Sequence, residues 1–466
     1  MNFKTNIKKY GFLETASQIA GKEGVELYIV GGFVRDLILK RELDEIDFLL
    51  VGIGNNFIKK FADILKVKNI SVYKNFGTAQ FQYKNLKLEF VNARKESYKK
   101  GSRNPKVTNG TFADDIARRD FTINTLAISL NLKNYGELID TYDGLKDIKN
   151  KLLNTPLNPE ETFDDDPLRI MRAFRFASTL GFEVDKKIIE AARTNKERLK
   201  IVSQERITDE FLKILSSPKP SIGLKLLQKS DVMSIIFPEI KNLEGTEQRK
   251  DHHHKEVFLH TCIVVDNISV HTENVWLRFA ALVHDIAKPQ TKKFVEGTGW
   301  TFHGHEELGA RMMDKIFKKL KLPLYKINYV KNLIRLHLRP IALAKEEVTD
   351  SAIRRFIVNA GEDLDDLITL CRADITSKNP NKVSKYLDNY ERVMKKVLDV
   401  KEKDKLRAFQ SPVKGEEIMK IFKLNPSKKV GDIKKAIEEA ILDGIIPNDY
   451  DEALKYLLKI KDDFLK

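Results

Sequence analysis

Two carboxylates stand two positions apart in an apolar run, Glu45 and Asp47 in EIDFLLV. Because the side chains of a β-strand alternate between its faces, both carboxylates should share one face, with Ile46 and Phe48 on the other. Adjacent carboxylates repel unless a cation lies between them, and Mg2+ prefers oxygen ligands beside nucleotide phosphates. A solvated sheet face has the same pattern, so this pair alone is a weak indication of a metal site.

The residues just before this strand suit a phosphate. Residues 27–30, LYIV, have the pattern of a buried strand. Gly31 and Gly32 then allow a tight turn in which backbone N–H groups stay available for an anion, and Arg35 adds a fixed fork of donors. Two glycines are weak evidence alone, but the order strand, turn, helix and acidic strand is far more specific.

A third carboxylate follows in LKLEF, residues 86–90. Alternation places Lys87 and Glu89 on one face of the expected strand and the apolar side chains on the other. Glu89 is therefore either a third acidic group beside Glu45 and Asp47 or an ordinary strand-surface residue.

Residues 164–177, DDDPLRIMRAFRFA, predict a helix with arginines at every third position, Arg169, Arg172 and Arg175. Like charges on one helical face repel unless an anion lies across them, although a solvated face can also hold them. An aspartate acceptor and an arginine donor, as in Asp166 and Arg169, can imitate a base edge.

Three further stretches carry local expectations. Residues 1–24 predict one amphipathic helix, and residues 97–111 predict a mobile basic loop. Residues 118–127, RRDFTINTLA, predict the start of a helix with Asn124 in its first turns.

Composition bounds the class of protein. A chain of 466 residues predicts two to four domains, and 42% apolar residues suffice for sizeable cores. The net charge of +15 favours a polyanionic partner such as nucleic acid, although a lysine-rich proteome gives the same balance. Cys262 and Cys371 have no zinc-like spacing, and no run reaches transmembrane length. These features predict a cytoplasmic protein with no membrane partner.

GGFVRD, DEIDF, RRDFTINTLA and the arginine helix together resemble the signatures of the class II tRNA nucleotidyltransferase and bacterial poly(A) polymerase family. The resemblance implies an α+β chain with a polymerase-beta-like mixed-sheet head followed by an all-helical neck, HD body and tail. The implied domains are a head at 1–155, a neck at 156–240, an HD domain at 241–380 and a helical tRNA-binding tail at 381–466.

The implied reaction is addition of CCA to the 3' end of tRNA from CTP and ATP without a nucleic-acid template, with Mg2+ and release of pyrophosphate. The resemblance implies that Asp166 and Arg169 read the edge of the incoming base. The resemblance assigns catalysis and Mg2+ binding to Glu45 and Asp47, with Glu89 as a third catalytic carboxylate. Its nucleotide-binding positions are Gly31, Gly32, Arg35, Arg119, Asp166, Arg169, Arg172 and Arg175.

The chain departs from the family pattern in the metal strand, where Glu45 replaces the usual aspartate. The extra methylene moves the carboxylate by about one bond length, to which metal sites are sensitive. Either Glu45 binds Mg2+ with altered geometry, or Asp44 replaces it, or the head has reduced activity. Asp165 stands where glutamate is usual, which is a milder change.

His260, His284, Asp285 and Asp374 resemble the HD phosphohydrolase pattern, with His303, His305 and His337 nearby. Imidazoles and a carboxylate suit a second divalent metal, which would activate water for phosphoester hydrolysis. Such domains also serve as scaffolds. His252 to His254 are expected in an exposed loop.

Three alternatives remain open at this point. One is a relative that adds only A, only CC or a poly(A) tail. Another is an HD phosphohydrolase whose weakened head senses nucleotides. The third is a tRNA-binding protein without turnover, and the oligomeric state is left open in every case.

Overall fold

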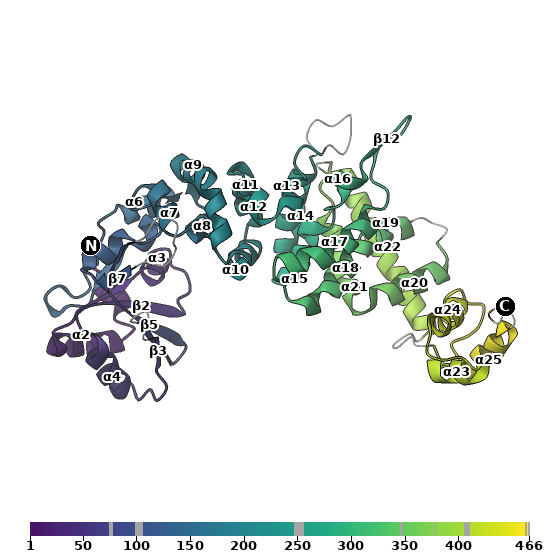
Figure 1. The fold of residues 1–466 in the computed structure, drawn as a ribbon, viewed down its shortest axis with the longest axis horizontal. Helices are drawn as coiled ribbons and strands as arrows, with labels where there is room; N and C mark the ends of the chain where they lie inside the picture. Colours follow the sequence, from purple (N-terminus) through teal and green to yellow (C-terminus); the bar gives the residue numbers. More distant parts are fainter. Residues whose placement is uncertain are drawn as a thin grey trace. The chain divides into compact units, whose positions relative to one another are not determined.

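The computed structural model describes residues 1–73, 78–97, 106–246, 256–344, 348–377, 379–404, 411–461 and 464. The chain divides into two compact units, Met1–Lys241 and Asn242–Lys466 (Figure 1). His252 to His254, expected in an exposed loop, lie outside the described residues. Among the described residues, no helix is both long and apolar enough to cross a membrane.

The first unit contains a seven-stranded mixed sheet in the order β3-β4-β5-β2-β1-β8-β9. β2 and β5 run parallel, and the other neighbours are antiparallel. The strands are β1 (Glu26–Val30), β2 (Glu45–Val51), β3 (Ser71–Tyr73), β4 (Thr78–Tyr83), β5 (Leu86–Asn92), β8 (Ala127–Ser129) and β9 (Leu138–Ile139). Two small pairs are β6 (Arg94–Ser97) with β7 (Lys106–Asn109) and β10 (Leu152–Leu153) with β11 (Glu183–Val184). The expected α+β class with a mixed-sheet head is confirmed.

Helices surround and follow this sheet. They are α1 (Lys4–Ile7), α2 (Phe12–Glu23), α3 (Gly32–Ile38), α4 (Asn55–Ile64), α5 (Phe112–Ala117), α6 (Gly144–Asn150), α7 (Pro159–Asp165), α8 (Leu168–Leu180), α9 (Lys186–Asn195), α10 (Gln204–Leu215), α11 (Pro220–Lys229), α12 (Met233–Ile236) and α13 (Pro238–Lys241). Short 3-10 helices are η2 (Thr122–Asn124), η3 (Leu132–Asn134) and η4 (Lys196–Ile201).

Three local predictions were wrong. The single helix expected over residues 1–24 is two helices, α1 and α2. The basic loop expected over residues 97–111 includes the strand β7, which pairs with β6. The helix expected in residues 118–127 is the single turn η2 followed by β8, because β8 pairs with β1 across the sheet.

One face of the sheet is packed with phenylalanines. Phe48 of β2 stacks on Phe90 of β5, with ring centroids 4.8 Å apart and planes 8° apart. Phe57 and Phe61 of α4 contact Phe90 from above the sheet. Burial of these rings holds β2 and β5 in register, and alternation then sends the side chains of Glu45 and Asp47 to the opposite face.

The second unit is mostly helical. Its helices are α14 (Val257–Ser269), α15 (Val275–Val283), α16 (Lys288–Thr291), α17 (His305–Lys319), α18 (Ile327–Leu336), α19 (Arg339–Leu343), α20 (Asp350–Ala360), α21 (Leu364–Ala373), α22 (Pro380–Asp404), α23 (Gly415–Phe422), α24 (Lys428–Leu442) and α25 (Tyr450–Lys459), with 3-10 turns η5 (Leu324–Lys326) and η6 (Gly361–Asp363). The hairpin of β12 (Lys293–Val295) and β13 (Gly299–Thr301) departs from the all-helical expectation. Helices α23, α24 and α25 share a small hydrophobic cluster that includes Phe422, Ile433 and Leu457.

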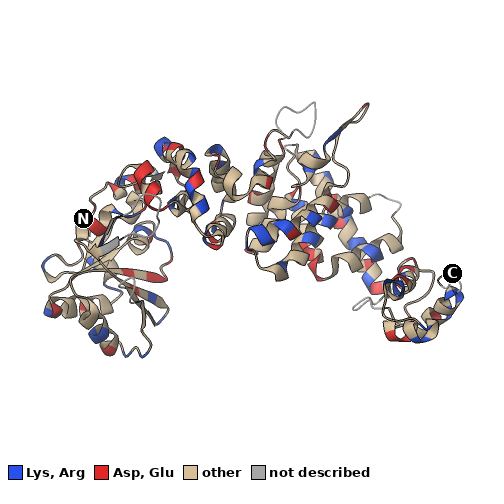
Figure 2. Cartoon of the chain, viewed as in Figure 1, with Lys and Arg blue, Asp and Glu red and all other residues tan. Residues whose placement is uncertain are grey.

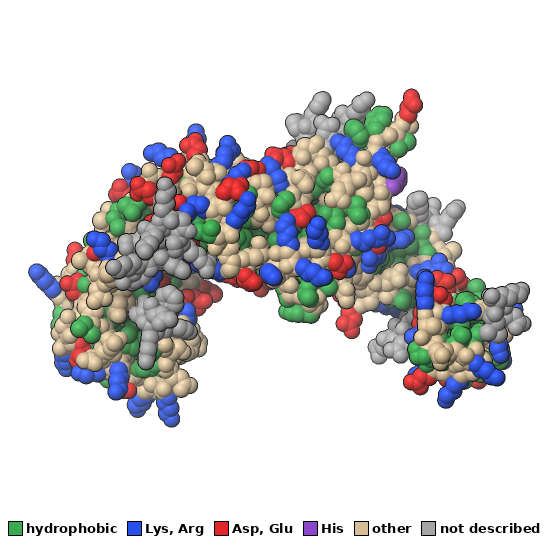
Figure 3. All heavy atoms as spheres, in the orientation of Figure 1, with side chains coloured by type: hydrophobic (Ala, Val, Ile, Leu, Met, Phe, Trp, Pro, Cys, Tyr) green, Lys and Arg blue, Asp and Glu red, His purple; other side chains and the backbone are tan. Residues whose placement is uncertain are grey.

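The positive charge is dispersed. Acidic and basic residues are interleaved along the helices of both units (Figure 2). On the face drawn in Figure 3, lysine and arginine side chains are likewise spread over both units. The distribution of charge therefore does not mark one region of either unit as a binding site.

Candidate active site and metal centre

The three predicted carboxylates of the head lie together. Asp47 and Glu89 occupy the same register position on the parallel strands β2 and β5, and Glu45 lies two residues before Asp47. Ligand oxygens of all three carboxylates lie within 4.8 Å of one another. Asp44, the proposed substitute for Glu45, is exposed and is not part of this group.

A lysine shares this acidic cluster. Lys87 is the register partner of Glu45. Its Nζ donates to Glu45 Oε1 at 2.6 Å and to Glu89 Oε2 at 3.1 Å. The cluster therefore already contains one positive charge, while Asp47 receives no hydrogen bond from Lys87 among the contacts of the described residues.

Asp47 is the carboxylate with the most perturbed environment in the cluster. Burial and the neighbouring charge of Glu45 together raise the pKa of Asp47 to about 6, against the opposing effect of Arg119. A raised pKa means that the ionised form is under-stabilised by the protein alone. A divalent cation would relieve that repulsion, and three carboxylates form the all-oxygen donor set that Mg2+ prefers. The residues present fit Mg2+.

The glycine turn lies directly against these groups. Gly31 has φ 73° and ψ −133°, a conformation that strongly favours glycine. A Cβ there would lie 3.0 Å from Arg119 Nη1 and 3.4 Å from Asp47 Oδ2. The N–H of Gly31, expected to remain available for a phosphate, instead donates to the carbonyl of Leu126. Gly31 thus provides space for Arg119 and Asp47, and Gly32 begins α3 beside it.

Arg35 points into the protein. Its Nη1 donates to Asn124 Oδ1 at 2.7 Å, while Nε and Nη2 donate to the Asp36 carboxylate at 3.0 and 2.6 Å. The guanidinium also lies 5.0 Å from the ring centroid of Phe176. These contacts join α3 to η2 and α8, and the triphosphate-binding role of Arg35 stays a prediction.

The RRD segment, residues 118–120, supplies two side chains that are held by ion pairs, Arg119 and Asp120. Arg119 Nη2 donates to Asp115 Oδ2 at 3.1 Å. Asp120 accepts from Arg172 and, through Oδ1, from Asn124 Nδ2 at 2.9 Å. Burial alone would raise the pKa of Asp120, but the charge of Arg172 and the hydrogen bonds from Asn124 and Arg172 together outweigh it and lower that pKa to about 2. Asp120 was not selected from the sequence, although it is the third residue of the RRD motif.

The three arginines of α8 each have their own partner. Arg169 Nη2 donates to the Arg118 carbonyl at 2.6 Å, and Arg172 is paired with Asp120. Arg175 Nε lies 2.9 Å from Glu210 Oε2, and its guanidinium lies 4.4 Å from the ring centroid of Phe176. The sequence predicted an anion lying across all three arginines. For Arg172 and Arg175 that anion is a carboxylate of the protein itself, from Asp120 and Glu210.

One pocket of about 680 Å3 collects most of the predicted head residues, a volume suited to a nucleotide. It is lined by Val30, Asp47, Phe48, Thr78, Glu89, Val91, Arg94, Arg118, Arg119, Asp120, Asp166, Arg169, Arg172 and Arg206. Arg94, Arg118 and Arg206 were missed. Arg118 begins the RRD motif and could have been selected there, whereas no sequence signal distinguished Arg94 and Arg206 from other basic residues. Arg35, Arg175, Glu45 and the two glycines are not among the lining residues.

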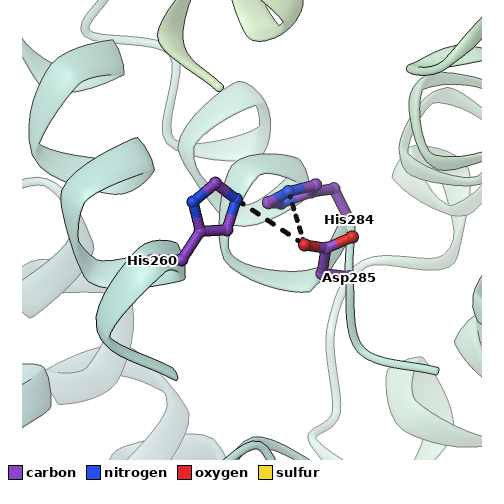
Figure 4. A group of neighbouring side chains, drawn as sticks. All are labelled: His260, His284 and Asp285. Atoms are coloured by element: carbon purple, nitrogen blue, oxygen red, sulfur yellow. Dashed lines mark ion pairs between the residues drawn. The ribbon is translucent and has the colours of Figure 1, made fainter. Parts of the chain in front are cut away.

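The predicted histidines and aspartates of the second unit also meet. His260 lies on α14, His284 and Asp285 follow α15, and Asp374 follows α21. His260 Nε2 and His284 Nε2 lie 3.6 and 3.2 Å from Asp285 Oδ2, and both rings point toward that carboxylate (Figure 4). They lie 2.8 and 3.4 Å from Asp374 Oδ1. Four side chains from three separate helices therefore converge on one point.

This centre fits a divalent metal. The four side chains place two imidazole nitrogens and two carboxylate oxygens around one buried point. Burial alone would lower the pKa of His284, but Asp285 and Asp374 outweigh it and raise that pKa to about 10. Burial alone would raise the pKa of Asp374, but His284 and His260 outweigh it and hold that pKa far below its usual range. Imidazole nitrogens with carboxylate oxygens are a ligand set that a divalent transition metal would satisfy.

Comparison with known proteins shows which families the two units resemble. Residues 27–154 match the poly A polymerase head domain, residues 181–244 the probable RNA and SrmB-binding site of polymerase A, and residues 251–379 the HD domain. The A-adding tRNA nucleotidyltransferase of Deinococcus radiodurans is 31% identical over 336 residues, covering 70% of this chain and 74% of that protein. The multifunctional CCA protein of Psychromonas ingrahamii is 31% identical over 315 residues, covering 64% and 71%.

Among solved structures, a tRNA nucleotidyltransferase complexed with a primer tRNA and an incoming ATP analog has the same fold. Its TM-score is 0.59 at 24% identity, over 82% of this chain and 99% of that one. The mixed sheet with its carboxylate-lined pocket defines a nucleotidyltransferase. More particularly, the chain is a tRNA nucleotidyltransferase of the class II CCA-adding and poly(A) polymerase family, and it carries an HD domain.

Proposed function

We propose that the chain adds C, C and A to the 3' end of tRNA from CTP and ATP, with Mg2+ and without a nucleic-acid template. The observation that carries this proposal is the single pocket that holds Asp47 and Glu89 together with Asp166 and Arg169. A nucleotide in it would have carboxylates near its phosphates and an acceptor and a donor near its base. Relatives divided between A-adding and multifunctional CCA enzymes make restricted addition the nearest alternative.

The roles follow from the contacts. Asp47, Glu45 and Glu89 would hold Mg2+, which when bound favours ionisation of the attacking hydroxyl and offsets charge at the α-phosphate. Arg119 and Arg172 line the pocket and would meet the phosphates and ribose. Their guanidiniums are held in place by Asp115 and Asp120, so little side-chain entropy would be lost on binding.

The base would be selected by Asp166 and Arg169. The Asp166 carboxylate accepts the Leu168 N–H at 3.2 Å, and Arg169 is anchored through the Arg118 carbonyl. An acceptor and a donor held in fixed positions present one hydrogen-bonding pattern, which is the requirement for choosing a base by its edge.

The test is incorporation of labelled CTP and ATP, separately and together, into tRNA that lacks its final CCA. Ordered addition of C, C and A by the wild type, with no addition by Asp47→Ala, is the expected result. Asp44→Ala is the matched control, because Asp44 is exposed and lies outside the carboxylate group. Addition of A alone to tRNA ending in CC would show a restricted enzyme, and loss of activity in Asp44→Ala would show that Asp44 replaces Glu45.

A second activity is favoured by the centre in the second unit, where the side chains of His260, His284, Asp285 and Asp374 converge. We infer that a divalent metal held there supports hydrolysis of phosphoesters. Hydrolysis of p-nitrophenyl phosphate that is lost in His284→Asn, while nucleotide incorporation stays at the wild-type level, would support it. No hydrolysis with any first-row metal would leave this centre as a scaffold.

A further inference from the structure

A two-stranded hairpin, β12 with β13, projects from the helices of the second unit (Figure 1). All three residues of β12 are exposed, and those of β13 are half-buried. Two glycines fix the turn between the strands, since Gly297 and Gly299 have φ of 80° and 89°. The hairpin therefore has a defined conformation although β12 is open to solvent.

Two aromatic rings share one face of this hairpin. Phe294 and Trp300 are direct register partners, and partners in an antiparallel pair project to the same side. Their ring centroids lie 5.2 Å apart with planes at 76°, an edge-to-face contact that orients both rings. Phe294 nevertheless keeps 50% of its surface exposed. The hairpin therefore presents an oriented aromatic ring on which a flat ligand can stack.

A lysine lies on the same face. Lys292 Nζ is 4.2 Å from the centroid of the Trp300 ring, a cation–π contact. Among the described residues, Lys292 belongs to no ion pair with a carboxylate. Lys288, at the base of the hairpin, differs because its Nζ donates to Asp285 Oδ2 at 2.6 Å. The positive charge beside the aromatic pair is therefore not neutralised by these parts of the protein.

The opposite face of the hairpin has no aromatic ring. By alternation, Lys293 and Val295 of β12 project away from the side that carries Phe294. Glu296, the one acidic residue between positions 292 and 302, lies in the turn. Hydrophobic and basic side chains both appear on this projection in Figure 3. One face thus combines rings with a cation, and the other offers a built-in comparison.

We propose that the aromatic face of the hairpin binds unpaired nucleotides of an RNA strand, with a base stacked on Phe294 and its phosphate near Lys292. Every base has a π face, so an aromatic side chain beside a cation suits single strands of any sequence. A base inside a duplex is stacked on its neighbours and does not offer that face. Because the chain belongs to a tRNA nucleotidyltransferase family, the strand is RNA. The surface is separate from the proposed CCA addition, whose residues lie in the first unit.

The test follows the fluorescence of Trp300 in the full-length chain. Trp276→Phe leaves Trp300 as the sole tryptophan and keeps a ring against its neighbours in the helical core. The probe is a single-stranded RNA of mixed sequence and about eight nucleotides, within the usual site size. A base on the adjoining ring should quench Trp300, and titration gives the dissociation constant. RNA bound in the first unit would not affect this signal.

Two matched pairs of variants in this background locate the contact. Phe294→Ala should weaken binding by roughly 5- to 150-fold, the effect of removing one stacking ring. Val295→Ala is its control, because Val295 is the next residue, is exposed and projects to the other face. Lys292→Gln should reduce the slope of binding against salt by about one, whereas Lys293→Gln should not. Thermal unfolding by circular dichroism shows that each variant is folded.

Several results would overturn the proposal. One is equal affinity of Phe294→Ala and Val295→Ala for the RNA strand. Another is equal quenching by the same strand annealed to its complement, or by inorganic polyphosphate, which carries charge without bases. No quenching by single-stranded RNA would also overturn it and would leave a protein as the partner of the exposed ring. Nucleotide incorporation is measured separately, so failure here leaves the proposed CCA addition untouched.

Discussion

Asp120 accepts two hydrogen bonds from the guanidinium of Arg172, through Nε at 2.8 Å and Nη2 at 2.5 Å. This pair joins the segment after α5 to the helix α8, which are 52 residues apart in the chain. Both residues line the pocket. The geometry of the proposed nucleotide site therefore depends on one ion pair between distant segments.

Replacing Asp120 with Asn should destabilise the first unit. The pKa of Asp120 is lowered to about 2, below its unfolded value, so the stabilisation is complete above about pH 4 and is lost as pH falls through about 2. A shift of this size corresponds to roughly 2 kcal/mol at neutral pH. Asp120→Asn should show that loss in urea denaturation followed by circular dichroism, with a smaller difference in acid.

Tryptophan fluorescence is the internal control for this measurement. Trp276 and Trp300 are the chain's two tryptophans, and both belong to the second unit. The fluorescence transition should stay where it is in the wild type. An equal loss of stability at every pH would contradict the assigned ion pair.

Gly31→Ala should damage the site without a change of charge. The positive φ of Gly31 costs an alanine about 1–2 kcal/mol, and the new Cβ would displace Arg119. Incorporation should fall by at least about tenfold, consistent with loss of one charge-assisted contact. Gly11→Ala, whose Cβ meets no heavy atom within 4 Å, should behave as the wild type. Equal activity of the two variants would exclude a role for the glycine turn.

Asp166→Ala should relax nucleotide choice. Loss of one acceptor to the base corresponds to about 1–3 kcal/mol, or roughly 5- to 150-fold in the preference for CTP and ATP over UTP and GTP. Competition between labelled nucleotides measures that ratio. Glu161→Ala, an exposed change on α7 outside the pocket lining, should leave it unaltered. A uniform fall in rate for all four nucleotides would instead indicate a purely structural role.

Mg2+ dependence should change with pH. Because the pKa of Asp47 is raised to about 6, protons compete with the metal below that pH, and the Mg2+ concentration for half-maximal incorporation should rise about tenfold per pH unit. Glu45 contributes to the raised pKa, so Glu45→Gln should move the transition to lower pH. A transition at the same pH in both proteins would assign it to another group.

Lys87→Met should reduce the Mg2+ requirement. Lys87 neutralises Glu45 and Glu89, and its removal frees both carboxylates for a cation. Because Lys87 is partly exposed, the effect should be modest, about three- to tenfold in the half-maximal Mg2+ concentration. Lys59→Met, on the exposed side of α4, is the control and should have no effect. A higher Mg2+ requirement would show that Lys87 positions the carboxylates for the metal.

The parallel pairing of β2 with β5, a tertiary contact, brings Glu89 beside Asp47, but local periodicity determined the face of each carboxylate. Alternation in 45–48 put Glu45 and Asp47 on one face, and alternation in 86–90 put Glu89 on the polar face of its strand, because a strand repeats every two residues whatever it pairs with. The glycine turn and the start of α3 were predictable for the same reason, since backbone freedom belongs to the residue itself. The order of motifs also predicted the family.

Only the tertiary structure decided which arginines line the pocket. Arg35 and Arg172 were both predicted to bind the nucleotide. Arg35 is hydrogen-bonded to Asp36 and Asn124 and is not among the lining residues, whereas Arg172 lines the pocket. The turn η2 replaced an expected helix because β8 pairs with β1, a contact that no local pattern encodes. The convergence of His260, His284, Asp285 and Asp374 depends likewise on how α14, α15 and α21 pack, and side-chain convergence across separate helices is a property of the folded core.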